Sequence, residues 1–102
     1  MKNVYLVVFE WSTDDTSAVD IQAFDTYEKA KQGFDNLIKD EMTSGNSWAS
    51  DAFDKDGNIL NNYELDEHCD SENREYECWW ELTNKNDWYQ HDFISIRVLE
   101  IK

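Results

Sequence analysis

The sequence contains no proline, only two cysteines and no long apolar run. No helix or strand is therefore interrupted by proline, which is the strongest breaker of both. The apolar run from Val4 to Phe9 is closed by Glu10 and is too short for a signal peptide or a membrane span. We therefore expect a cytoplasmic protein of a bacterial cell or a phage-infected host. In that compartment Cys69 and Cys78 are expected to be free thiols, with a disulfide between them as the alternative.

Basic residues are also scarce, because nine lysines and arginines oppose 23 aspartates and glutamates for a net charge of −14. Residues 40–81 hold most of the imbalance, with thirteen acids, two bases and a net charge of −11. Direct binding to DNA, RNA or an anionic membrane is disfavoured by this charge. The acidity is then compatible with binding to a basic protein partner, with binding of a cation, or with solubility alone. The chain should still fold, because 40% of its residues are hydrophobic and 15% are aromatic, whereas disordered acidic tails are poor in both.

The length predicts a single acidic α+β domain over residues 1–102. Residues 3–11 carry apolar side chains on both faces, as in a central strand covered at least partly on both sides. Residues 18–24 follow as a strand with one apolar and one polar face, and the two strands most simply form a hairpin.

A helix is predicted over residues 26–42, where apolar residues recur at helical spacing and lysines lie outside the stripe. Asp25 is the expected N-cap, with Glu28 three residues later as in a capping box. Gly33 costs this helix about 1 kcal/mol relative to alanine and allows close packing on the sheet.

The second half is predicted to be rich in strands. Residues 47–53 and 58–65 flank the turn "DKDG", residues 74–82 form the clearest strand, and residues 88–102 form the last one, with a bulge near Leu99. We expect a single antiparallel or mixed sheet of about five strands with one main helix packed on one face.

No stretch carries a specific catalytic or cofactor motif. "FDKDGNI" resembles a calcium-binding EF-hand loop, but with Gly57 at position six, Ala52 and Tyr63 occupy the positions of the first and last ligands. A tight hairpin turn with Gly57 in a left-handed conformation fits better. The histidine and two cysteines of residues 68–78 lack the paired spacing of structural zinc sites. We therefore expect no metal, no cofactor and no enzymatic activity.

The most distinctive stretch is "ELDEHCDSENREYECWWEL", residues 64–82, which holds eight carboxylates. Alternation in its strand places Cys78, Trp80 and Leu82 on the core face, and Trp79 among carboxylates on the other. Such a tryptophan either packs against a neighbouring element or anchors a partner. We predict that the partner-binding residues lie on the acidic face of this strand and on the connection leading into it: Glu64, Asp66, Glu67, Asp70, Glu72, Glu75, Glu77, Trp79 and Glu81.

In size, acidity and small α+β format, the chain resembles phage- or mobile-element-encoded inhibitors that imitate DNA, including anti-CRISPR and anti-restriction proteins. The resemblance rests on the stretch "ELDEHCDSENREYE" and on the lack of a catalytic motif. It implies a non-enzymatic protein whose acidic surface binds a basic protein partner, such as the nucleic-acid channel of a CRISPR effector. The alternative is a small cytosolic housekeeping or cation-responsive domain whose acidity serves solubility.

Overall fold

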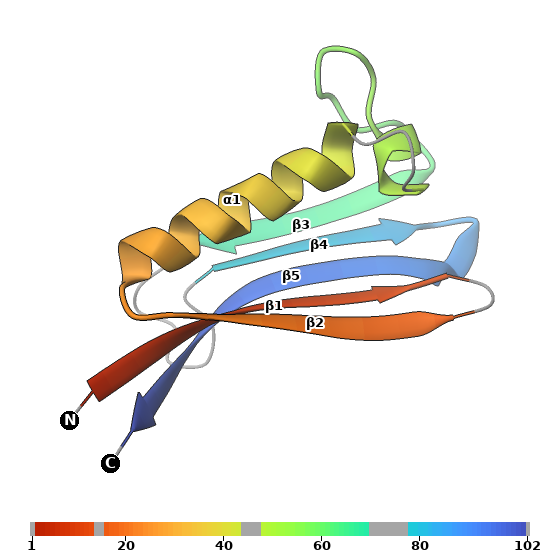
Figure 1. Ribbon diagram of the computed structural model, residues 1–102. Coiled ribbons are helices and arrows are strands. Elements are labelled where there is room, and N and C mark those ends of the chain that lie inside the picture. Colours follow the sequence, from red (N-terminus) through yellow and green to blue (C-terminus); the bar gives the residue numbers. More distant parts are fainter. Residues whose placement is uncertain (1, 14–15, 44–47, 70–77, 102) are drawn as a thin grey trace.

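A computed structural model describes residues 2–13, 16–43, 48–69 and 78–101 of the chain. These ranges contain five strands, one α-helix and one short 3₁₀ helix (Figure 1). In chain order the elements are β1 (Lys2–Ser12), β2 (Ser17–Phe24), α1 (Tyr27–Thr43), η1 (Trp48–Ala52), β3 (Tyr63–Cys69), β4 (Cys78–Asn84) and β5 (Asp87–Ile101).

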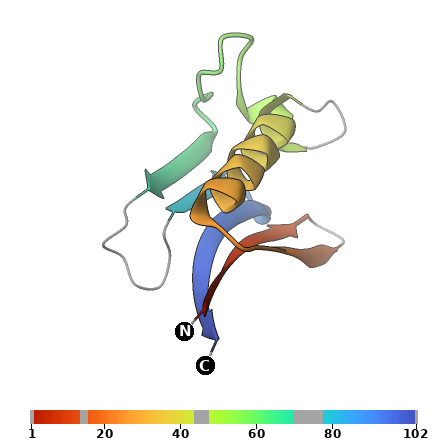
Figure 2. The same ribbon diagram turned by 60° about the vertical axis from the view of Figure 1, so that its left-hand side comes forward.

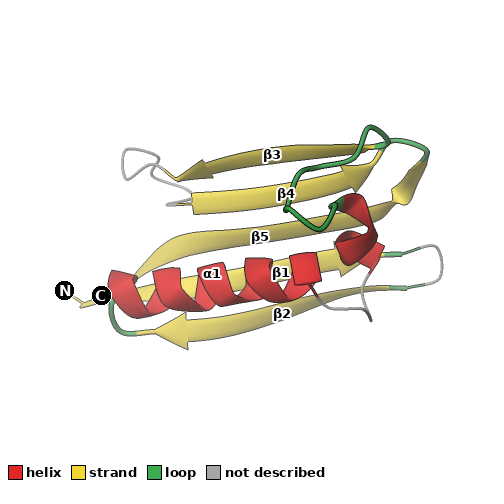
Figure 3. Ribbon diagram, turned by 90° about the horizontal axis from the view of Figure 1, so that it is seen from above, coloured by secondary structure: helices red, strands yellow, loops and turns green. Residues whose placement is uncertain are grey.

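The five strands form one antiparallel sheet in the order β2-β1-β5-β4-β3. β5 lies in the middle beside β1, and β2 and β3 are the two edges. The helix α1 runs along one face of the sheet, and η1 lies on the same side (Figures 1 and 3). The predicted class, a single sheet of about five strands with one main helix on one face, is therefore confirmed.

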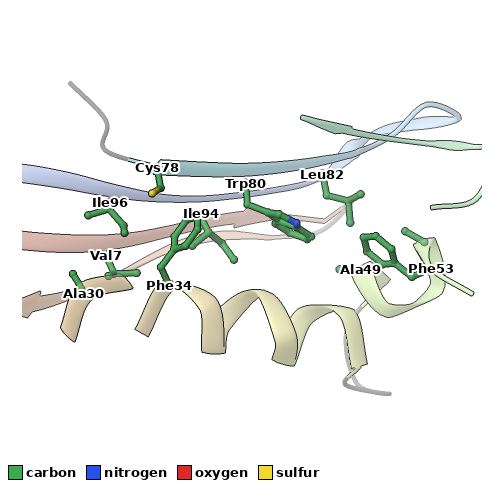
Figure 4. Close-up of a cluster of buried hydrophobic side chains, with 11 residues drawn as sticks. Val7, Ala30, Phe34, Ala49, Phe53, Cys78, Trp80, Leu82, Ile94 and Ile96 are labelled. Carbon is green, nitrogen blue, oxygen red and sulfur yellow. The ribbon is translucent and has the colours of Figure 1, made fainter. Parts of the chain in front are cut away.

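The hydrophobic core lies between the sheet and the helical layer (Figure 4). Trp80 and Leu82 of β4 and Ile94 and Ile96 of β5 point toward α1, and each is at most 1% exposed. Phe34 of α1 packs against this group from the other side. The core face predicted for β4 is confirmed, because alternate residues of a strand share a face.

The start of α1 differs from the prediction by one residue. Thr26 is the N-cap, since its Oγ1 accepts a hydrogen bond from the backbone amide of Lys29 at 3.2 Å. Asp25 instead forms an ion pair with Lys29, with the carboxylate 3.0 Å from the ammonium group. Threonine and aspartate are both accepted at N-caps, so composition alone did not distinguish the two positions.

The close packing predicted at Gly33 is confirmed. A Cβ atom built at Gly33 would lie 3.0 Å from Cζ of Phe24, at the end of β2. The glycine therefore lets α1 approach the sheet edge more closely than a side chain would allow.

The strand predicted over residues 47–53 is wrong in its described part. The 3₁₀ helix η1 covers Trp48–Ala52, and Phe53 forms an isolated bridge to Ile59. Ala49 and Ala52 are both fully buried and lie three residues apart, a spacing that shares one face of a helix but would fall on opposite faces of a strand.

The turn predicted after this segment is confirmed. Gly57 adopts a φ of 84°, in the left-handed region that favours glycine. One carboxylate oxygen of Asp54 accepts hydrogen bonds from the backbone amides of Asp56 and Asn58, each at 2.9 Å. The bond from Asn58 is the main reason that the pKa of Asp54 is lowered. Asp54 thus holds the turn with its own side chain.

Two strand details also differ from the predictions. The β1–β5 register continues without a shift through Leu99, which pairs with Val4, so the bulge predicted there is wrong. The irregularity lies instead between Thr83 and Asn84, at the end of β4. β3 begins only at Tyr63, because the preceding residues form a turn.

Cys69 and Cys78 form a disulfide, so the expectation of free thiols is wrong. The two residues are partners in the β3–β4 register, with their Cα atoms 4.0 Å apart. Strand register brings them together, and neither their spacing nor the expected compartment reveals it. The hydroxyl of Tyr27 lies 3.3 Å from Sγ of Cys78 and 3.5 Å from Sγ of Cys69. It is the hydrogen-bond donor here, since paired sulfurs carry no hydrogen.

Reduction of this disulfide should lower the free energy of unfolding by about 2–3 kcal/mol, because the bond closes a segment with a sequence separation of 9. Urea denaturation with and without reductant measures the effect. A variant with both Cys69→Ala and Cys78→Ala should lose at least as much stability and should not respond to reductant. Equal stability of the oxidised and reduced wild type would contradict the prediction.

Candidate functional site

In the described part of the chain, one face of the sheet has no helical cover, and we call it the open face (Figures 1 and 2). The strand registers align its residues in rows that cross all five strands. One row, from β3 to β2, is His68, Trp79, Ser95, Val8 and Ile21. The next row is Asp66, Glu81, Phe93, Glu10 and Val19. Charge and apolar surface are therefore unevenly distributed across the face.

The open face divides into two halves. The acidic half lies on β3 and β4 and is defined by Glu64, Asp66 and Glu81. The apolar half lies on β2, β1 and β5, with Glu10 and Arg97 among its side chains. Its apolar members are Val4, Leu6, Val8, Val19, Ile21, Ala23, Phe93 and Leu99.

The acidic half sets like charges against each other. Asp66 and Glu81 are direct partners across the β3–β4 pair, and Glu64 lies two residues along β3 on the same face. Like charges placed directly opposite each other in a sheet are destabilising. These three residues help to line a shallow groove of about 290 Å³. The arrangement suits the binding of cationic groups, because a cation placed there would relieve the repulsion.

Two carboxylates of the acidic half, those of Glu81 and Asp66, are held by neighbouring side chains. Nε2 of His91 lies 2.8 Å from Oε2 of Glu81, whose side chain is still 37% exposed. Nε1 of Trp79 donates a hydrogen bond to Oδ2 of Asp66 at 3.4 Å. The ring of His68 packs on that of Trp79, with centroids 4.7 Å apart. These contacts orient the carboxylates without removing them from solvent.

The structure brings four of the predicted partner-binding residues together on the open face: Glu64, Asp66, Trp79 and Glu81. Glu67 lies on the opposite, helix-facing side, where it is the register partner of Trp80. The prediction that Asp66 and Glu67 lie on a connection is wrong, since β3 continues through them and its residues alternate between the faces, whereas the strand predicted through residue 65 is correct from Tyr63 onward. Outside the described residues lie Asp70, Glu72, Glu75 and Glu77.

The apolar half was missed by the sequence analysis. Val19 and Ile21 of β2 are 59% and 57% exposed, and Leu99 of β5 is 52% exposed. The pattern of residues 18–24 did reveal that one face of the strand is apolar. What it did not reveal is that this face points away from the helix.

A second unpredicted feature is the buried carboxyl group of Asp92, which is 1% exposed on the helix-facing side of β5. Its Oδ2 atom has no hydrogen-bond partner among the described residues. Burial, reinforced by the neighbouring carboxylate of Glu41, raises the pKa of Asp92 to about 8, and a hydrogen bond from Trp48 opposes this only in part. Asp92 is thus largely protonated at neutral pH. A side chain this enclosed does not meet a substrate in this conformation.

Searches against protein-family models, curated proteins and solved structures find no match to the chain. Across the described ranges, no helix is both long and apolar enough to span a membrane. The same ranges contain no group of three or more histidine, cysteine, aspartate or glutamate side chains placed to hold a metal ion.

Proposed function

We propose that the protein is a non-enzymatic binding protein that presents its acidic half to a basic protein partner. The observation that carries the proposal is the direct opposition of Asp66 and Glu81 on an uncovered face, with Glu64 beside them. The opposition itself costs the fold stability, because like charges placed directly opposite each other in a sheet are destabilising. A partner that brings lysine or arginine turns the same arrangement into a source of affinity.

The partner class that fits best is a protein that normally holds a nucleic acid, such as a CRISPR effector, and the protein would act as its inhibitor. Residues on one face of a strand lie about 6.7 Å apart, whereas one DNA strand carries a charge for every 3.4 Å or so of helix axis. A single strand therefore supplies about half the charge density of a nucleic-acid strand. Glu64 and Asp66 lie one such spacing apart on β3, and Glu81 lies beside Asp66 on β4. The acidic half therefore places three carboxylates along a length of strand that corresponds to about three phosphates of one DNA strand.

Acidity that serves only solubility is the second candidate. It is favoured by exposed acids that lie away from the open face, including Asp40 of α1, Asp51 of η1 and Asp56 of the following turn. The two candidates differ in one respect. A solubility function depends on the total charge of the chain, and a binding function depends on where the charge lies.

The test is competition between the protein and a labelled DNA duplex for a panel of basic nucleic-acid-binding proteins that includes an RNA-guided nuclease. We expect displacement of DNA that weakens steeply with added salt, because exposed charges are screened beyond about 8 Å at physiological ionic strength. A variant with Glu64→Lys, Asp66→Lys and Glu81→Lys should lose this competition while remaining folded. We call it the triple-lysine variant.

A matched control carries Asp40→Lys, Asp51→Lys and Asp56→Lys. It changes the net charge by the same amount but leaves the acidic half intact. It should compete like the wild type. The proposal is wrong if the triple-lysine variant displaces DNA as well as the wild type does. It is also wrong if the triple-lysine variant and the control lose the ability to displace DNA to the same extent.

A further inference from the structure

The strand β2 is apolar on the side where the sheet has no helical cover. Val19 and Ile21 project onto the open face and are more than half exposed, whereas Asp20 and Gln22 lie on the helix-facing side. In a sheet with one solvated face, the usual arrangement is the reverse, with apolar residues toward the core and polar residues outward. β2 is inverted in this sense, and because Asp20 and Gln22 are exposed as well, neither face of residues 19–22 packs into the core.

The inverted strand continues an apolar surface rather than forming an isolated one. Ile21 is the register partner of Val8, which is buried, but Ala23 is the partner of Leu6, which is half-buried and lies two residues from Val4 on the same face. On the other side of β1, Leu99 of β5 pairs with Val4 on the same face. Contiguous exposed apolar side chains that are bordered by polar groups often mark interaction sites.

The size of the apolar half limits what can cover it. β2, β1 and β5 have 8, 11 and 15 residues, and at about 3.3 Å per residue and about 4.8 Å between strands they span about 540 Å². Two partners meeting there would bury about 1,080 Å² in total, below the range of about 1,200–2,000 Å² for standard complexes. With the seven residues each of β3 and β4, the whole face spans about 760 Å², and an interface of about 1,500 Å² lies within that range. A partner with an interface of standard size therefore covers both halves.

Charge then determines the chemistry of that partner. A second copy of this chain could meet the apolar half in three ways. It would leave the acidic halves uncovered, set Glu64, Asp66 and Glu81 against the same residues of its mate, or bury these carboxylates without partners on the apolar half of its mate, which is costly. Two copies also each carry a net charge of −14. A partner of opposite charge has none of these difficulties.

We infer that the whole open face is one docking surface, for a protein that places apolar side chains on the apolar half and lysine or arginine side chains on the acidic half. This rests on the proposed function for the acidic half and adds the contribution of β2, β1 and β5. Binding is then not purely electrostatic. Part of the affinity comes from burial of Val19, Ile21 and Leu99, and that part persists at high salt.

Two synthetic peptides of equal length and charge test the inference. One is an amphipathic helical peptide of leucine and lysine, and in the other serine replaces leucine. The wild type should bind the leucine peptide at least about tenfold more tightly, a difference of about 1.4 kcal/mol. The apolar variant, Val19→Thr with Ile21→Thr, should lose most of this difference. Threonine keeps the preference for a strand and removes the apolar tip.

The control is Gln22→Thr, on the opposite side of the same strand, which should bind the leucine peptide like the wild type. Thermal melts should show that the wild type, the apolar variant, the Gln22→Thr control and the triple-lysine variant are all folded. If the apolar variant binds the leucine peptide like the wild type while the triple-lysine variant does not, the inference is wrong and the proposed function stands. If the triple-lysine variant binds both peptides like the wild type, the proposed function fails as well. Sedimentation of the wild type as a dimer that the apolar variant abolishes would assign the face to a second copy and overturn the inference.

Discussion

Replacing Asp92 with asparagine is expected to stabilise the protein by several kcal/mol at pH 8 and by almost nothing at pH 4. Asp92 has a folded-state pKa of about 8, above the ordinary value of 3.8. Between these two pKa values the carboxyl group of Asp92 is protonated in the folded state and ionised in the unfolded state. The free energy of unfolding of the wild type therefore falls as pH rises. The slope is about 1.4 kcal/mol per pH unit, which amounts to about 3–5 kcal/mol between pH 4 and pH 8.

Asparagine is the appropriate replacement because it has the shape of the protonated acid and carries no charge. Its amide can still accept the hydrogen bond from Trp48 and can donate one toward Glu41. Urea denaturation of the wild type and of Asp92→Asn across pH 4–8 gives the difference directly, and the titration of other carboxylates cancels from it. Asp40→Asn, at an exposed position, is the control and should show no such trend. A difference that does not grow with pH, or an asparagine variant that is less stable at pH 8, would contradict the assignment.

The adjacent tryptophans of β4 should respond to truncation in opposite ways. Trp80 is 1% exposed and stacks on Phe53, with ring centroids 6.2 Å apart. Trp80→Ala should therefore lower the free energy of unfolding by about 3–5 kcal/mol, as expected for an aromatic side chain removed from a core.

Trp79 lies on the open face and is only partly buried against His68. Trp79→Ala should cost about 1 kcal/mol or less in stability and about 2 kcal/mol or more in affinity for a basic partner, since tryptophan is prominent among binding hot spots. Denaturation and salt-dependent binding measured on the same variant separate the two effects. Trp79→Phe, which keeps the ring contact but removes the hydrogen bond to Asp66, is the conservative comparison. Lost stability with unchanged affinity would identify Trp79 as a packing residue.

Periodicity predicted those parts of the fold that depend on neighbours in the sequence. The alternation of Cys78, Trp80 and Leu82 with Trp79 and Glu81 was correct, because a strand imposes it whatever lies beside it. The helix over residues 26–42 was correct to within a residue for the same reason.

Features that depend on which strands are neighbours could not be predicted from the sequence. Cys69 and Cys78 meet through the register of β3 on β4. Val19 and Ile21 share a face whatever the topology, but only the sheet order shows that this face is uncovered. The position of Asp92 is also a property of the assembled core, since an acid in an otherwise ordinary strand pattern gives no sign of burial.

The position of β5 in the sheet has a consequence for how the chain folds. This strand pairs with β1 on one side and β4 on the other, so it joins the β1–β2 hairpin to the β3–β4 pair, which share no strand pairing of their own in the described sheet. Nearly every β1–β5 contact spans most of the chain, and such a high contact order is associated with folding in milliseconds to seconds rather than microseconds. During synthesis, the β1–β2 hairpin and β3–β4 leave the ribosome as separate pieces with unpaired edges. Sheet assembly must therefore await the synthesis of β5, and loss of part of β5 would leave two strand pairs with unpaired edges that are prone to aggregate.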